Sequence, residues 1–209
     1  MSELNTIHRV SDLEALNAIY GCPAITSIKK QVNYIHPHYR KLVEAAPFAV
    51  LATNGPEGLD ASPRGDPAGF IRVYDEKTLL LPDRRGNNRI DSLRNIVHDP
   101  RVALLFLIPG VGETLRINGK AAITTDPVLL DQFSVNGRPP LSVLVIDVEE
   151  VFFQCSRAIL RSRLWDSSLH VERGTLPSTG AILEAMSNAE IDGEKYDSDL
   201  SERVQKTLY

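Results

Sequence analysis

The sequence predicts a mainly β protein with peripheral helices, built around a small antiparallel barrel. Short runs rich in valine, leucine and aromatic residues recur between residues 48 and 155, and turns containing glycine or proline separate them. Strands at this spacing are typical of a barrel, whereas strands alternating with long helices would predict a layered βαβ fold. Helical periodicity is concentrated near the two ends of the chain and in two short interruptions of the strands.

The strands follow one another closely. We expect them at residues 48–53, 60–64, 69–74, 78–81, 101–108, 115–124, 141–148 and 151–155. Residues 101–108 form a nearly continuous apolar run, which is typical of a strand buried on both faces. The segment Asn54-Gly55-Pro56-Glu57-Gly58 carries residues that favour a turn.

Helices are expected at residues 37–46, 90–97, 127–133 and 179–189, with Asp126 as the N-cap of the third. A further helix begins at the capping box Ser11-Asp12-Leu13-Glu14 and has its apolar face at Leu13, Leu16 and Ile19. The polar stretch from Asp192 onward is expected to have little order. We therefore divide the chain into an N-terminal helical extension (1–46), a barrel domain (47–166) and a C-terminal helical tail (167–209) that packs on the barrel or on a partner.

Composition excludes several classes of protein. The 209 residues carry a formal net charge of -4 and a pI near 5.7, which gives no general attraction to nucleic acid or to an anionic membrane. The apolar run 102–111 is too short to span a bilayer, and the charged N-terminal segment does not resemble a signal peptide. A cytoplasmic location is therefore expected.

Metal and thiol chemistry are not expected either. His36 and His38 could bring two imidazoles together, but no acidic or cysteine cluster completes a metal site. Two cysteines cannot form a disulfide framework, and Cys155 is expected to be a small buried side chain at the end of a strand.

The most informative segment is Pro82-Asp83-Arg84-Arg85-Gly86-Asn87-Asn88-Arg89, which ends a strand and opens a helix. A helix N-terminus presents free amides, and guanidinium groups donate two hydrogen bonds at once to phosphate oxygens. Asn87 or Asn88 could cap the helix or donate directly, and Gly86 lets the backbone approach closely. This segment predicts a phosphate-binding loop; the alternative is a solvated charged turn.

Three other segments could contribute. In Ser62-Pro63-Arg64-Gly65 the arginine is held on a constrained backbone, and its alternative role is a salt bridge with Asp66. Arg116 lies on a strand whose polar residues alternate with apolar ones. The polar face of that strand therefore lines a groove or meets solvent. Residues 154–165 hold the sole tryptophan, Trp165, and three arginines, a combination suited to stacking a planar ring or, alternatively, to a core tryptophan beside surface arginines.

Taken in order, these motifs resemble the pyridoxamine 5'-phosphate oxidase-like family of FMN-binding split barrels. The resemblance covers residues 48–165, with SPRGD, PDRRGNNR and RSRLW as its most specific pieces. It implies a six-stranded Greek-key split barrel that forms a homodimer, with FMN bound in clefts between the subunits.

The resemblance also implies roles for individual residues. Arg64, flanked by Ser62 and Gly65, matches the phosphate-contacting arginine, and Asn88-Arg89, preceded by Asn87, falls where a basic pair holds the phosphate. The strand end Leu81-Pro82-Asp83 would lie beside the flavin ring. Arg161, Ser162 and Trp165 would come from across the dimer. Which of these asparagines and arginines makes which contact is open.

The expected function is an FMN-dependent oxidoreductase that transfers a hydride or electrons between a small molecule and bound FMN, with a nicotinamide nucleotide as a possible donor. Residues 201–209 lack the arginine-and-histidine substrate motif of true pyridox(am)ine phosphate oxidases, which argues against vitamin B6 chemistry. Two alternatives are open: a flavin-binding sensor without turnover, and a split barrel that binds deazaflavin or heme, with His98 and His170 as candidate heme ligands. No catalytic acid or base is identified.

Overall fold

The computed structural model describes residues 9–209, which fall into two compact units, one ending at Gln31 and the other comprising Val32–Tyr209. The first eight residues of the expected N-terminal extension lie outside this range. The first unit contains α1 (Leu13–Tyr20) and a short helix that the sequence did not predict, α2 (Ile25–Lys29). The N-cap of α1 is Asp12, whose carboxylate accepts from the Ala15 amide, so the expected capping role of Ser11 is wrong.

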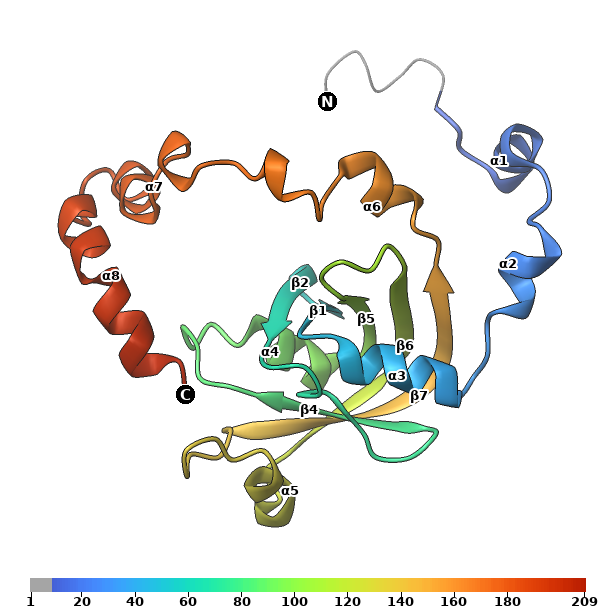
Figure 1. The fold of residues 1–209 in the computed structure, drawn as a ribbon, viewed down its shortest axis with the longest axis horizontal. Coiled ribbons are helices and arrows are strands. Elements are labelled where there is room, and N and C mark those ends of the chain that lie inside the picture. Colours follow the sequence, from blue (N-terminus) through green and yellow to red (C-terminus); the bar gives the residue numbers. More distant parts are fainter. Residues whose placement is uncertain (1–8) are drawn as a thin grey trace. The chain divides into compact units, whose positions relative to one another are not determined.

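The second unit is built on one antiparallel sheet that curls into a split barrel (Figure 1). Its strand order is β2-β1-β5-β6-β7-β4-β3. The strands are β1 (Phe48–Gly55), β2 (Gly58–Gly65), β3 (Arg72–Val73), β4 (Thr78–Asp83), β5 (Arg101–Leu107), β6 (Thr114–Thr124) and β7 (Ser142–Gln154). The mainly β split barrel is confirmed, but it has seven strands rather than six, because the two-residue β3 pairs with β4 at one edge.

β7 is one continuous strand of 13 residues where the sequence predicted two. The polar residues near its middle do not break it, because Asp147 and Glu149 point away from the core. Opposite them, Asn118 pairs with Glu150 whereas Gly119 pairs with Val148, which leaves Glu149 as the extra residue of a β-bulge.

The core is formed by the alternate residues of the strands that face the inside of the barrel. β1 contributes Ala49, Leu51 and Thr53, and β5 contributes Val102, Leu104 and Phe106, all buried. The intervening residues of β5 are only partly buried, so the expectation that this strand is buried on both faces is wrong. An apolar outer face therefore remains on this part of the sheet.

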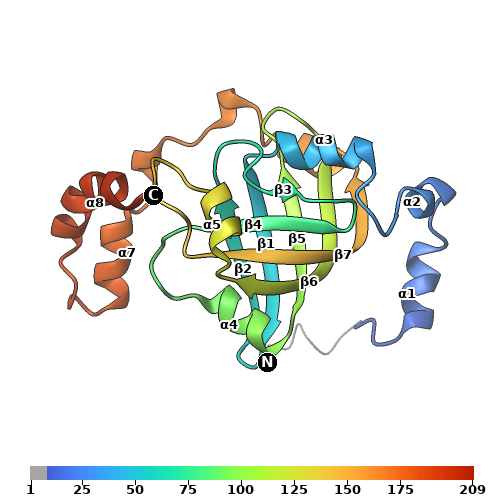
Figure 2. The same ribbon diagram turned by 90° about the horizontal axis from the view of Figure 1, so that it is seen from below.

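Helices close the barrel at its ends. α3 (Pro37–Ala45) and α4 (Asp91–His98) lie at opposite ends (Figure 2), both close to their predicted positions. α4 is anchored by the buried Asn95, whose side-chain amide donates to the Thr53 hydroxyl at 3.1 Å. α5 (Pro127–Gln132) begins at Asp126, whose carboxylate accepts from the Val128 amide, as predicted.

The chain after β7 is more helical than expected. α6 (Arg157–Ser162) and two single 3₁₀ turns, Ser167–Leu169 and Arg173–Thr175, lead to α7 (Thr179–Met186) and α8 (Gly193–Thr207). α8 occupies the stretch that was expected to have little order, since Asp192 caps its first turn by accepting from the Lys195 amide.

Within residues 9–209, no helix is both long enough and apolar enough to cross a membrane. Cys22 and Cys155 are free and exposed thiols, so the expected burial of Cys155 is wrong.

The bulge generates a stability prediction. A methyl group at Gly119 would lie 2.1 Å from the Asp147 carbonyl oxygen, which is backbone and cannot move aside without distorting β7. We expect Gly119→Ala to lower the free energy of unfolding by about 2–4 kcal/mol, measured by urea denaturation.

Gly174→Ala is the matched control, because no atom lies within 4 Å of its added methyl group. It should leave the free energy of unfolding within about 1 kcal/mol of the wild-type value. Equal stability of the two variants would contradict the packing at the bulge.

Candidate functional site

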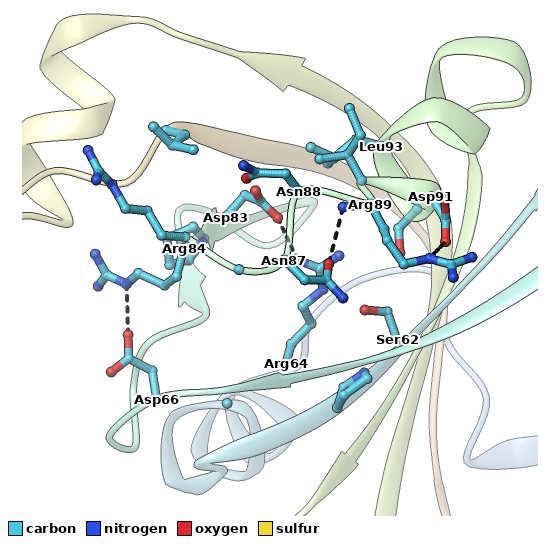
Figure 3. A pocket seen from close by; sticks show the side chains of 18 of the residues that line it. Ser62, Arg64, Asp66, Asp83, Arg84, Asn87, Asn88, Arg89, Asp91 and Leu93 are labelled. Carbon is cyan, nitrogen blue, oxygen red and sulfur yellow. Dashed lines mark hydrogen bonds and ion pairs between the residues drawn. The ribbon is translucent and has the colours of Figure 1, made fainter. Parts of the chain in front are cut away.

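The candidate site is a cavity of about 550 Å³ between the edge strand β2 and the loop that joins β4 to α4 (Figure 3). We call it the Arg64 pocket. Its walls come from β2, the β4–α4 loop and three more distant segments. They comprise Asp60, Ser62–Asp66, Phe70, Pro82–Leu93, Leu141, Leu208 and Tyr209.

Strand β2 supplies one wall through its alternating side chains. Asp60, Ser62 and Arg64 face the same side of the strand, because successive side chains of a strand point to opposite faces. Pairing of Arg64 with Ala49 and of Ser62 with Leu51 places them on the side that carries the core. At the edge of the sheet this side opens into the pocket. Asp60 also accepts from the buried Ser92 hydroxyl at 2.5 Å, which ties β2 to α4.

Two ion pairs cross between the ends of β2 and β4. Arg64 Nη1 lies 2.5 Å from Asp83 Oδ1, and Arg84 Nε lies 2.9 Å from Asp66 Oδ2. The alternative considered from the sequence, a local pair of Arg64 with Asp66, is therefore wrong: each aspartate pairs with the arginine of the other strand end. Figure 3 shows both pairs inside the pocket.

The first pair leaves Arg64 with a donor to spare. Its side chain is 16% exposed, and its Nε is buried without a hydrogen-bond partner among the described residues. A buried unpaired donor on a charged group is unfavourable, and an acceptor that reached it would remove that cost. Asp83 holds the guanidinium in place by a different nitrogen, so Arg64 is oriented before any anion arrives.

The loop before α4 adopts an unusual backbone conformation. Asn88 (φ 58°) and Ile90 (φ 52°) both lie in the left-handed region, which is costly for the β-branched Ile90 in particular. Asn87 stabilises the turn by accepting from the Arg89 amide at 3.1 Å. Ile90 is the N-cap of α4 and supplies no side-chain acceptor, so an acceptor from outside can approach the free amides.

The pocket contains as many acidic groups as basic ones. Its arginines are Arg64, Arg84, Arg85 and Arg89, and its aspartates are Asp60, Asp66, Asp83 and Asp91. Arg89 lies at the surface, where its hydrogen bond to Asp91 raises the pKa of the guanidinium. Guanidinium groups carry five donors, so an ion pair that uses one or two leaves others for a ligand. The unused guanidinium donors of these residues are of a chemical type that binds phosphate.

Eight of the residues expected at a cofactor site come together in this pocket. They are Ser62, Arg64, Gly65, Pro82, Asp83, Asn87, Asn88 and Arg89. Leu81 does not line it, because its side chain is fully buried in the core beneath the loop.

The remaining expected residues lie elsewhere on the barrel. Arg116 is on the outer face of β6, with its guanidinium 5.5 Å from the centre of the Phe152 ring. The Trp165 indole N–H donates to the Val111 carbonyl at 2.8 Å, which fixes the segment after α6 to the β5–β6 turn. Arg161 and Ser162, at the end of α6, are likewise not in the lining of the Arg64 pocket. Their roles stay predictions.

Other lining residues were missed from the sequence. Asp60 could have been found, because it continues the alternation of Ser62 and Arg64 along β2, whereas Asp66 was considered only as a partner of Arg64. Tyr209 lies 143 positions from the aspartate that it contacts, and no local pattern connects the two.

Metal and heme candidates were also located. Within residues 9–209, no three histidine, cysteine, aspartate or glutamate side chains gather as metal ligands. His98 lies on a separate cavity of about 330 Å³ beside α4, and the exposed His170 follows a 3₁₀ turn. Neither is among the residues that line the Arg64 pocket.

Fold and site together define a split-barrel protein with an arginine- and aspartate-lined pocket at the edge of the sheet. Residues 35–155 match the sequence profile of the family described as "Pyridoxamine 5'-phosphate oxidase". The chain therefore belongs to the pyridoxamine 5'-phosphate oxidase family, which confirms the resemblance seen in its motifs. Members of this family are commonly flavin-binding oxidoreductases.

Solved structures with a similar fold include HupZ of Group A Streptococcus, which is 23% identical, with a TM-score of 0.48 over 58% of this chain and 95% of its own. A Clostridium acetobutylicum protein related to general stress protein 26 is 15% identical, with a TM-score of 0.44 over 56% and 86%. General stress protein 26 of Bacillus anthracis is 16% identical, with a TM-score of 0.40 over 55% and 93%. Such distant similarity bears on neither ligand nor activity. Among curated proteins, none matches at a significant level.

The ion pair between Arg64 and Asp83 leads to a prediction about stability. Asp83→Asn removes the negative partner of a largely buried guanidinium, and we expect it to lower the free energy of unfolding by about 1–3 kcal/mol. Asp91→Asn makes the same change in the exposed pair with Arg89 and should cost less than about 1 kcal/mol. Chemical denaturation measures both. A larger loss for Asp91→Asn would contradict the assigned burial of the two pairs.

Proposed function

We propose that this protein is an FMN-dependent oxidoreductase that binds the FMN phosphate in the Arg64 pocket and acts on a small molecule. The observation that carries the proposal is the buried, unpartnered Nε of Arg64 in a pocket of a family whose members commonly bind flavins. Ser62, Asn88 and Arg89 would supply further donors to the phosphate, and Pro82 and Asp83 would lie beside the ring.

Bound FMN would supply the redox chemistry, by accepting and giving up a hydride or electrons. The protein would bind FMN, orient it and exclude water from the site. Arg64 is oriented in advance by Asp83, so little freedom is lost on binding. Arg116, or an arginine of residues 157–163, would supply positive charge at the pyrimidine end of the ring and favour its reduced, anionic form.

The second wall of the cofactor cleft would come from a homodimer. Pairing aligns Pro63 of β2, Val50 of β1 and Leu105 of β5 in one row across the outer face. The next row consists of Ala61, Ala52 and Ala103. Solvent-facing positions of an antiparallel sheet are usually polar, and contiguous apolar patches mark interfaces. We therefore propose these two rows, here called the outer face, as the dimer interface.

The first test is cofactor content. Purified protein should be yellow, absorb near ~450 nm as flavins do, and release FMN on denaturation. Anaerobic bleaching by NADH or NADPH would support turnover with a nicotinamide donor, whereas bound FMN that resists reduction by both would favour a flavin-binding protein without turnover. Colourless protein that does not bind added FMN would contradict the proposal.

Arg64→Ala should raise the dissociation constant for FMN about 10- to 100-fold, the loss expected for charge-assisted hydrogen bonds to a phosphate. Quenching of flavin fluorescence measures it, after the melting temperature shows that the variant is folded. Arg40→Ala is the matched control, because Arg40 pairs with Glu44 on α3 and is not part of the pocket lining. Unchanged FMN affinity of Arg64→Ala would remove Arg64 from the phosphate site.

Leu105→Asp should convert the dimer into a monomer, because two carboxylates would be buried where two apolar rows meet. Light scattering coupled to size-exclusion chromatography measures the mass, and FMN should be lost in parallel. Val128→Asp, at a 70% exposed position on α5, should leave both the dimer mass and the FMN content unchanged. Wild-type protein that is monomeric at micromolar concentration would contradict the interface.

A further inference from the structure

The last two residues of the sequence lie in the wall of the Arg64 pocket. The Tyr209 hydroxyl donates to Asp66 Oδ1 at 2.8 Å, and the Asp66 side chain is only 3% exposed. The Arg84 guanidinium lies 5.6 Å from the centre of the Tyr209 ring. Tyr209 therefore adds a third member to the Asp66–Arg84 ion pair.

This contact persists at neutral pH. The hydrogen bond to Asp66 raises the pKa of the Tyr209 phenol, so its hydroxyl remains protonated and able to donate. Both oxygens of Asp66 accept a hydrogen bond, Oδ2 from Arg84 and Oδ1 from Tyr209. Removal of the phenol would leave one oxygen of a buried carboxylate without its donor, which is unfavourable.

The element that carries Tyr209 is a helical hairpin. α8 packs mainly on α7, and their closest approach requires glycine, since a methyl group on Gly180 would lie 2.0 Å from the Gly193 carbonyl oxygen. The Gly180 amide also donates to Asp197 of α8 at 2.8 Å. The hairpin is therefore held together by its own contacts.

The polar contacts between the end of this hairpin and the barrel, within the described residues, are few. Besides the contacts of Tyr209 with Asp66 and Arg84, Arg138 Nη1 donates to the Tyr209 carbonyl oxygen at 2.8 Å. A small set of contacts at the rim of a pocket, carried by a separate hairpin, is the arrangement of a closing segment. Leu208 and Tyr209 line the same pocket as Arg64.

We propose that Leu208 and Tyr209 form a latch over the Arg64 pocket, and that opening of this latch limits how fast a phosphate-bearing ligand enters and leaves. The latch itself rests on the contacts of Tyr209; FMN as the ligand rests on the proposed function. Because Tyr209 contacts Asp66, Arg84 and Arg138 and not Arg64, the latch should affect the rates of binding more than the equilibrium affinity.

The experiment compares Tyr209→Ala, Tyr209→Phe and the wild type by stopped-flow fluorescence with FMN added to apoprotein. Tyr209→Ala should raise both the association and the release rate about tenfold, as expected when a charge-assisted hydrogen bond and a cation–π contact are lost. Tyr209→Phe keeps the ring and should give a smaller increase. Tyr74→Ala is the matched control, because this exposed tyrosine precedes the β3–β4 turn and is not in the pocket lining.

Rates for Tyr209→Ala equal to those of Tyr74→Ala would overturn the latch. An altered dissociation constant with an unchanged association rate would also overturn it, because Tyr209 would then be an ordinary contact to the ligand.

A second measurement does not depend on FMN. Amide hydrogen exchange in the last turn of α8, residues 203–207, should be faster in Tyr209→Ala than in the wild type, since this end of the helix loses its attachment to the barrel. Unchanged exchange would overturn the latch even if FMN binds. Wild-type protein that does not bind FMN, with faster exchange in Tyr209→Ala, would support the latch and contradict the proposed function alone.

Discussion

The Arg64 pocket depends on two ion pairs that join strands which are not neighbours in the sheet. β2 lies at one edge, and the order β2-β1-β5-β6-β7-β4 separates it from β4 by four strands. Only the curl of the sheet brings their ends face to face, and Arg64–Asp83 and Asp66–Arg84 bridge them there. Each pair sets the position of the other, because all four residues belong to two short strand ends. Without them the pocket would have two mobile rims in place of two fixed walls.

The ion pairs between the two strand ends also determine how the pocket arginines can bind a ligand. A cluster of unpaired guanidinium groups would repel one another and hold no fixed geometry. Here three of the four pocket arginines have a carboxylate partner, which offsets their positive charge and fixes the direction of the unused donors. A phosphate in the proposed site would then be bound by orientation as much as by net charge. Binding of that kind should be less sensitive to salt than attraction to an unpaired basic patch.

Strand β2 serves two purposes, since it has two faces and lies at the edge of the sheet. Ser62 and Arg64 face the pocket, while Ala61 and Pro63 between them belong to the outer face. In the proposed dimer, a shift of β2 would move the phosphate contacts and the interface together. Cofactor retention and dimerisation should therefore be coupled through the backbone of one strand, without contact between the ligand and most of the interface.

Much of this architecture was predictable because it depends on local patterns. Alternation and turn residues located six of the seven strands to within a few residues, and Asp126 identified the start of α5. The ion pairs were less predictable. The sequence suggested Asp66, a near neighbour, as the partner of Arg64, whereas the curl of the sheet brings Asp83 to Arg64 instead. The continuity of β7 was hidden because its polar residues sit at a bulge that belongs to the pairing with β6. The contact of Tyr209 could not be predicted either, because it also depends on tertiary structure. Its contact with Asp66 depends on where the α7–α8 hairpin returns the chain, and no residue near Tyr209 indicates that position.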